Sequence, residues 1–556
     1  MKILQKWDAW AEQKRSPYIL LAILAVINVL YILLVDIFPF QDMPQHLTYA
    51  KIIGDYGKSG NLFERYYDLT AHFTTYHTYH WVLSFLGRLF GIEAGFKVLL
   101  LLYFVSLSWG MSYLMDAYDP DLKASPWKKL LIQLCIWNAT IGMGFMPFVQ
   151  SMPFFTIAIG AFLRLRTGRG DLVKNWVVFW VALVLLSLTH VVTACAVVFF
   201  LALYTLFDRA ERPFFILLAN VLFFLVTSRL YGGLGRGGLT EHQTIQWSES
   251  FVHSYDFEFV TSLFNVTWSP LPVTMNYVFW NFIGPYQLTT LIPLALLYAV
   301  LVFILYRLSA PKKVSGGPGE KNKKKNAEVV TSVPEKVEKK FQYAYKMAAK
   351  IFLLFAIFLP WGIYIPSEIT FINYRLLTLA LFLIIGLWPW NWFEHSRQKL
   401  IVTFIAFLSI GLYSYKTYLY QQETKVPLRM ISRIPSNRIV GSVVFGNRSE
   451  HFTRILRLTH FLPMYYTLRN SGINGQFWAC YAPHLPVCYK PGKAVSNTPD
   501  WHPWKFKAED LNDVDYLLYS TMYYANNPVE TGIKQAILER MNALDCEAGW
   551  CLYRKK

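Results

Sequence analysis

Charged residues are scarce in this sequence. They make up 16% of its 556 residues, whereas a soluble globular protein usually has about a quarter. Their absence creates long apolar runs, such as residues 17–38, 176–207 and 376–390. About 20 apolar residues in a helix span the hydrocarbon core of a bilayer. The runs also lack the alternation of β-barrel strands, so the sequence predicts a polytopic α-helical membrane protein.

Ionisable residues are also rare inside the apolar runs. A proton-coupled transporter or an ion channel needs such groups along its conduction path, so both classes are disfavoured. The net charge of +18 does not indicate nucleic-acid binding, because much of it lies in one segment. Residues 307–346 hold 10 Lys and 1 Arg against 4 Glu. We interpret this as a basic cytoplasmic loop, and we expect no nucleic-acid partner.

Basic clusters predict the orientation of the chain. Cytoplasmic connections of membrane proteins are enriched in Lys and Arg. One arrangement places every basic cluster in the cytoplasm: about 11 spans (11 to 13), a cytoplasmic N-terminus and an extracytoplasmic C-terminus. The first run is too long for a cleaved signal peptide and lacks a small-residue cleavage site. The clusters are Lys2/Lys6/Lys14/Arg15, Lys123/Lys128/Lys129, Arg164/Arg166/Arg169/Lys174, Arg209/Arg212 and Arg397/Lys399.

Two segments of the predicted bundle allow more than one interpretation. Residues 76–91 could form a span or an interfacial helix. Residues 176–207 are too long for one span, and we expect two short helices that turn near Thr189 and His190.

The predicted domains follow from composition. Residues 1–423 form the transmembrane domain, with outer loops at 39–96 and 230–284 and a disordered cytoplasmic linker at 307–346. From residue 424 the composition changes. Candidate strands at 439–445 and 515–520 and a helix at 531–544 predict a small extracytoplasmic α/β domain over residues 424–556.

The cysteines support an oxidising compartment for this tail. Four of the six lie in it, and an even, closely spaced set is typical of disulfides. The local pairs would be Cys480–Cys488 and Cys546–Cys551, although four cysteines allow three pairings. A zinc site that includes His484 is the alternative.

Asp42 and His46 are the first candidates for chemistry. Asp42 follows the first run within a few residues, and His46 lies one helical turn later, so both could share a helix face. Pro44 suits the first turn of a helix. A simple N-cap is therefore the alternative role of Asp42.

This pattern resembles the GT-C glycosyltransferases, a superfamily that includes protein mannosyltransferases, aminoarabinose transferases and bacterial membrane proteins of unknown role. The layout of many spans followed by an outer soluble domain is also similar. The chain lacks the Asp-x-Asp of oligosaccharyltransferases after its first run, so we expect no cofactor, with a divalent metal as the alternative. The motifs that carry the resemblance are Asp42-x-x-x-His46-Leu47, Gly144-Phe145, Thr189-His190 and Asn373-Tyr374-Arg375.

The resemblance implies an enzyme of the bacterial inner membrane that works on its periplasmic face. It would move a sugar from a polyprenyl-phosphate donor to a glycan, lipid or protein acceptor. Asp42 would be the general base, and direct displacement with one base implies inversion at the anomeric carbon. His46 would orient Asp42 or bind the phosphate.

The same resemblance implies the binding residues. Arg375 would bind the leaving phosphate through its guanidinium, with snorkelling to lipid headgroups as the alternative. Glu368 would pair with Arg375, and Arg229 is a second candidate cation. His190 would bind donor or acceptor, or have only a structural role.

Two other functions remain open. A lipid-linked sugar or polysaccharide transporter, or a flippase without transferase activity, would need polar groups at mid-depth, of which Asn138 is the best example. A structural or assembly protein would work through its disulfide-bearing tail.

Overall fold

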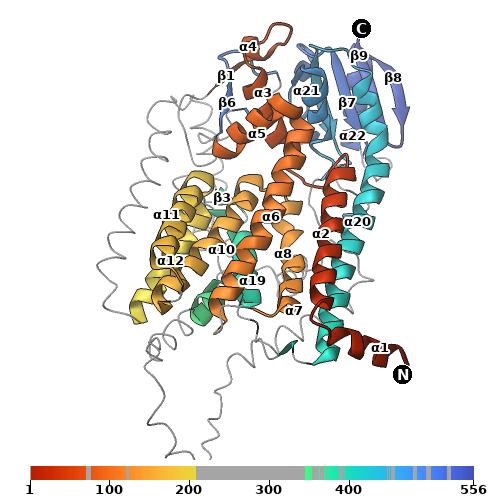
Figure 1. Cartoon of the computed structure of the whole chain (residues 1–556). Helices are drawn as coiled ribbons and strands as arrows, with labels where there is room; N and C mark the ends of the chain where they lie inside the picture. Colours follow the sequence, from red (N-terminus) through yellow and green to blue (C-terminus); the bar gives the residue numbers. More distant parts are fainter. Residues whose placement is uncertain are drawn as a thin grey trace, which may run out of the picture.

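The computed structural model shows a helical bundle with a β-sheet at one end (Figure 1). We call this the sheet end, and the N-terminal helix α1 (Lys2–Ala11) lies at the opposite end. The residues that the structure describes are 2–69, 77–119, 124–168, 170–207, 345–352, 362–363, 369–370, 372–386, 388, 392–393, 395–446, 449, 451–452, 458–479, 485–495, 503–521 and 528–556.

Five of the described helices are long and apolar enough to cross a membrane. This confirms the prediction of a multi-pass helical protein. Two shorter apolar helices, α12 (Val191–Phe207) and α19 (Ile372–Gly386), complete the described bundle. The predicted outer loop 230–284 and nearly all of the linker 307–346 lie outside the described residues. The five long helices are α2 (Ser16–Leu34), α6 (Ile92–Tyr118), α10 (Met146–Thr167), α11 (Leu172–Thr189) and α20 (Ser396–Ser432).

The long run at 176–207 forms two helices, as predicted. Helix α11 ends at Thr189 and α12 begins at Val191, so His190 alone forms the corner. The Thr78 hydroxyl, 2.7 Å from the Leu188 carbonyl, donates a hydrogen bond that ties this corner to the sheet end.

Helix α5 (His77–Phe90) lies within residues 76–91, the segment that could be either a span or an interfacial helix. Its 14 residues extend roughly 21 Å, too short for a hydrocarbon core of about 30 Å. Trp81, Phe85 and Leu89 on it are exposed, and it packs on α3 (Met43–Asp55) and α6 at the sheet end (Figure 1). It is therefore an interfacial helix.

A broken segment connects α6 to α10. It runs through α7 (Pro126–Lys129), the 3-10 turn η1 (Leu130–Ile132), α8 (Gln133–Ile136) and α9 (Ala139–Gly142). Asn138 holds the break, because its amide donates to the Cys135 carbonyl at 2.9 Å and its carbonyl accepts from the Thr140 backbone at 3.0 Å. The one polar group that suggested a transport path therefore has a structural role.

The tail forms a five-stranded mixed sheet in the order β5-β4-β7-β9-β8. Strands β5, β4 and β7 are parallel, while β9 runs antiparallel to β7 and to β8. Helix α20 continues through residue 424, where the sequence predicts a boundary, to Ser432. The strands are β4 (Ile439–Val444), β5 (Ile473–Asn474), β7 (Tyr516–Ser520), β8 (Met541–Glu547) and β9 (Trp550–Lys555).

The helix predicted at 531–544 is wrong at its end. Helix α22 covers Pro528–Arg540, and residues 541–544 belong to strand β8. A tight turn at Ala548 and Gly549, both with positive φ, lets β8 pair with β9. Hairpin pairing therefore outweighs the helical propensity of these residues. The minor elements are α4 (Phe63–Tyr66), β1 (Tyr67–Leu69), β2 (Gly362–Ile363), β3 (Ile369–Thr370), η5 (Leu462–Met464), α21 (Tyr465–Asn470), β6 (Val487–Tyr489), η6 (Pro503–Lys505) and η7 (Ala508–Leu511).

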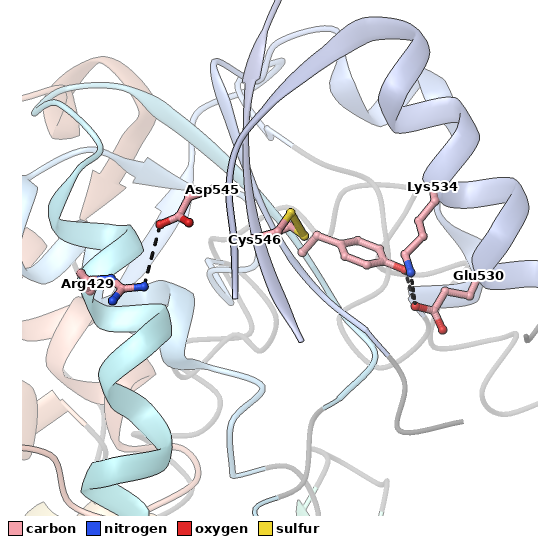
Figure 2. The surroundings of a disulfide bond; sticks show 7 residues. Arg429, Glu530, Lys534, Asp545 and Cys546 are labelled. Carbon is pink, nitrogen blue, oxygen red and sulfur yellow. Dashed lines mark hydrogen bonds and ion pairs between the residues drawn. A yellow bond between two sulfur atoms is a disulfide. The ribbon is translucent and has the colours of Figure 1, made fainter. Parts of the chain in front are cut away.

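The predicted Cys546–Cys551 disulfide is present and joins β8 to β9. Figure 2 shows it beside the ion pair between Arg429 of α20 and Asp545 of β8. Arg433, one turn later, also binds Asp545, at 2.6 Å. Cys488 is disulfide-bonded, and Cys480, its predicted partner, lies outside the described residues. Ion pairs thus fix the sheet to the end of the last span.

The first outer loop and the tail share one hydrophobic core. Tyr49, Phe63 and Tyr67 of the loop pack with Val443 and Leu517 of the sheet. Strand β1 of the loop pairs with β6 of the tail. Because the loop completes the core of the tail, the sheet is held against α3.

Candidate active site

Asp42 lies at the sheet end, between α2 and α3. It occupies the N-cap position of α3, but its carboxylate makes no capping hydrogen bond to that helix. The side-chain amide of Gln41 donates to the Asp42 carboxylate at 3.1 Å. Only 9% of the Asp42 surface is exposed. A buried carboxylate that does not cap its helix is free for chemistry.

A glycine turn holds the backbone of Asp42. The backbone N–H groups of Gln41 and Asp42 donate to the carbonyls of Gly142 and Met143, at 2.9 and 3.2 Å. Gly144 has φ +80°, and a Cβ there would lie 2.5 Å from the Asp42 nitrogen. Any side chain at 144 would therefore push Asp42 away. The Gly144-Phe145 motif is in this way part of the Asp42 site.

Arg375 approaches the same site from α19. Its guanidinium carbon lies 4.5 Å from the ring centre of Phe145 and 5.8 Å from that of Phe148. It is buried and lies in the first turn of α19. The N-terminal end of a helix carries partial positive charge, so the helix itself does not stabilise a cation there. Such a placement is suited to binding an anion.

Burial and charge together set the pKa of Asp42. Burial raises the pKa of this carboxyl from 3.8 to about 7, while the hydrogen bond from Gln41 and the charge of Arg375 oppose the rise. A carboxyl with a pKa near neutral pH can accept a proton from a substrate and release it again. Perturbed values of this kind are concentrated at functional sites.

His190 also contacts Phe148. Its ring stands edge-on to that of Phe148, with centroids 5.2 Å apart. Its Nδ1 accepts a hydrogen bond from the Val192 backbone at 3.2 Å, so in the neutral ring the proton is on Nε2. Phe148 therefore lies within reach of both Arg375 and His190.

His46 pairs with His80, which the sequence did not single out. Nδ1 of His46 and Nε2 of His80 are 2.9 Å apart. His80 is fully buried, and its ring contacts those of Tyr49 and Tyr79. The signal for His80 was weak because it lies on an amphipathic helix among other aromatic residues.

Two predicted site residues cannot be placed beside this cluster. Arg229 and Glu368 lie outside the described residues. Within the described part of the chain, no three His, Cys, Asp or Glu side chains gather as they would around a metal ion.

Solved structures share this fold. No protein-family model and no curated protein matches the sequence. The chain is similar to ArnT from Cupriavidus metallidurans in the apo state, with a TM-score of 0.54 and 11% identity over 96% of this chain and 97% of that one. It is also similar to the same ArnT bound to undecaprenyl phosphate, with a TM-score of 0.53 and the same identity and coverage. This likeness over nearly the whole of both chains confirms the predicted fold, a multi-pass helical bundle with a small C-terminal sheet region.

Proposed function

We propose that this chain is a membrane glycosyltransferase that moves a sugar from a polyprenyl-phosphate donor to an acceptor at the sheet end of the bundle. One observation carries the proposal: Asp42 is a buried carboxyl that does not cap its helix, and it lies near enough to Arg375 for the guanidinium charge to act on it. A base and a phosphate-binding cation are what such a transfer needs. The ArnT that shares this fold has been solved with undecaprenyl phosphate, which supports a lipid phosphate as the sugar carrier.

The proposed reaction is a single displacement. The acceptor hydroxyl attacks the anomeric carbon of the donor, and Asp42 takes the hydroxyl proton as the new bond forms. The bond from the anomeric carbon to the phosphate oxygen breaks, and its electron pair stays on the phosphate. Arg375 stabilises that added negative charge through its guanidinium. The products are the inverted glycoside and the free polyprenyl phosphate.

Secondary roles follow from position. His190 binds donor or acceptor across Phe148, and His46, backed by His80, orients Asp42 or contacts the phosphate. Glu368 and Arg229 stay predicted partners for Arg375 and the donor. Arg375 supplies the cation, so the proposal needs no metal.

The sidedness of the bundle supports a periplasmic site in a bacterial inner membrane. Two basic pairs lie away from the sheet. Helix α7 holds Lys128 and Lys129, and the last turn of α10 holds Arg164 and Arg166. Cytoplasmic ends of membrane proteins are enriched in such residues. We therefore place α1 in the cytoplasm and the sheet outside. The acceptor is a glycan, lipid or protein.

Binding of undecaprenyl phosphate to the full chain in nanodiscs tests the donor half of this proposal. Arg375→Gln should weaken binding about tenfold or more, since a charge-assisted hydrogen bond contributes roughly 1.5–3 kcal/mol. Arg164→Gln is the matched control, because Arg164 also lies over an aromatic ring, that of Tyr113 at 4.1 Å. Equal binding by both variants would remove Arg375 from the donor site.

Catalysis is tested by sugar release from a panel of radiolabelled undecaprenyl-phosphate sugars. Turnover of at least one donor by the wild type supports a transferase. Donor binding without release of any sugar would favour the flippase instead.

A further inference from the structure

A groove of about 660 Å³ shares no lining residue with the candidate active site, which we call the Asp42 cluster and which consists of Asp42, Arg375, His190 and His46. It opens between the end of α2, the start of α6, and helices α20 and α21. None of the residues that form the Asp42 cluster lines it. Lys51, which does, lies nine residues after Asp42 along α3, roughly 14 Å for a helix. The groove is therefore a second site.

Two pairs of opposite charge in the groove are explained by the fold. Lys51 binds Asp55 at 2.6 Å, and Arg469 binds Glu93 at 2.9 Å. The first pair holds the last turn of α3 and the second joins α21 to α6. Neither pair requires a ligand.

One cation and one anion in the groove form no ion pair with a described residue, although Lys97 uses one of its three N–H donors to stabilise the end of α2. The ammonium of Lys97 donates to the Leu33 carbonyl at 2.8 Å, and it makes no ion pair with any described residue. The carboxylate of Asp36 likewise forms no ion pair within the described part of the chain, although its backbone N–H is bound by the Gln421 side chain at 2.9 Å. Because Leu33 and Asp36 are three residues apart, both charges lie at the same end of α2.

The position of the groove along the length of the bundle indicates that its ligand is a lipid. Helix α2 ends at Leu34, which is 73% exposed, and α5 ends at Phe90, which is 58% exposed and lines the groove. In a membrane protein such outward apolar side chains face the acyl chains. Asp36 comes two residues after Leu34, and Lys97 donates to the carbonyl of Leu33. Both charges therefore lie at the depth of the lipid headgroups.

We propose that this groove binds a membrane phospholipid whose headgroup carries a phosphate and a primary amine. Lys97 binds the phosphate, Asp36 accepts hydrogen bonds from the ammonium, and the acyl chains lie along Leu34 and Phe90. A primary ammonium donates hydrogen bonds to a carboxylate, which a quaternary ammonium cannot do. The proposal concerns binding alone and stands whether or not the chain transfers a sugar.

Native mass spectrometry of the full chain in detergent tests this proposal. Phosphatidylethanolamine, phosphatidylglycerol and phosphatidylcholine with identical acyl chains are titrated separately. The ethanolamine lipid should bind about fivefold more tightly than the other two, the upper range for exposed ion pairs. Soluble glycerophosphoethanolamine should bind more weakly, because it lacks the acyl chains.

Two variants test which groove residue binds the phosphate of the headgroup and which binds its ammonium. Lys97→Gln should weaken binding of the ethanolamine and glycerol lipids alike, whereas Asp36→Asn should remove only the preference for ethanolamine. Lys425→Gln, an exposed lysine of α20 outside the groove, is the control and should change nothing. Equal binding of all three lipids, or ethanolamine-lipid binding unchanged in both groove variants, would overturn the proposal. Displacement by undecaprenyl phosphate would also overturn it, since the groove would then be part of the donor site.

Discussion

Helix α19 has a buried cation near each end, and its dipole acts on the two in opposite ways. Near its last residue, the ammonium of Lys128 donates to the Gly386 carbonyl at 2.8 Å. Helix C-termini carry partial negative charge and unpaired carbonyls, so Lys128 stabilises the helix. At the other end, Arg375 lies in the first turn, where the helix dipole disfavours a cation. The comparison contrasts a cation that the helix dipole stabilises with one that it does not, which agrees with the proposed role of Arg375 in phosphate binding.

Helix α10 shows the same contrast. Arg164 and Arg166 lie in its last turn, where cations are favoured. Its first turn instead presents Phe145 and Phe148 to Arg375. The two arginines of α10 thus lie where its dipole favours a cation, whereas Arg375 lies where the dipole of α19 does not.

Of the substitutions at the two ends of α19, Arg375→Gln should have the largest effect on sugar release. Sugar release should fall by about 10²–10³-fold, as for other groups that stabilise charge in a transition state. The unfolding temperature should fall only slightly, because the lost contacts of the guanidinium with Phe145 and Phe148 are offset in part by removal of a cation that the helix dipole disfavours. A parallel loss of stability would instead show that Arg375 is structural.

Gly144→Ala should act through the position of Asp42. The added Cβ would meet the Asp42 backbone, and a displacement of roughly 1 Å can cost about 10²-fold in rate. Gly168→Ala is the control at the opposite end of α10. It also has positive φ, so both variants are strained, and only Gly144→Ala should lower single-turnover rates of the folded protein.

The dependence of sugar release on pH should report Asp42. A base must be ionised, so kcat/KM should rise about tenfold from pH 6 to pH 8 through an apparent pKa of about 7. Arg375→Gln removes a charge that lowers this pKa, so the rise should move to higher pH. An unshifted profile in the variant would contradict the coupling.

The free energy of unfolding should fall as pH rises, whereas kcat/KM should increase. The pKa of Asp42 is higher in the folded protein than its ordinary value of 3.8, so folding favours the protonated form. The stability that this form contributes is lost as pH rises from about 4 to about 7. Asp42→Asn should therefore gain stability relative to the wild type at pH 8 and not at pH 4.

Lys128→Met should have the smallest effect on function. It leaves a buried carbonyl at Gly386 unpaired, which costs about 1–3 kcal/mol. Thermal unfolding should register this loss, while sugar release per folded molecule stays within about twofold of the wild type. A large loss of turnover would mean that the two cations of α19 are not distinct in role.

The sequence predicted the bundle and most of the cluster because each signal is local. Asp42, Gly144, His190 and Arg375 each stand where an apolar run begins, ends or turns, and basic clusters indicate which ends share a face. Nothing local shows that the charge of Arg375 acts on Asp42, since this depends on how the helices pack.

The sequence did not predict several other features, for related reasons. The three residues of β1 are too few to indicate a strand, so the common core of the first loop and the tail was not foreseen. His80 gains its meaning only from the Nδ1–Nε2 contact with His46. The end of α22 depends on a hairpin partner that follows it in the chain.

The most direct test of this account is Asp42→Asn, measured beside the wild type in nanodiscs. Donor binding and sugar release are followed separately on the same preparations. Undecaprenyl phosphate binding should be kept, while sugar release falls by about 10²–10⁴-fold, the contribution of a general base. Unchanged sugar release in the variant would contradict the account, because Asp42 would then have no part in the reaction.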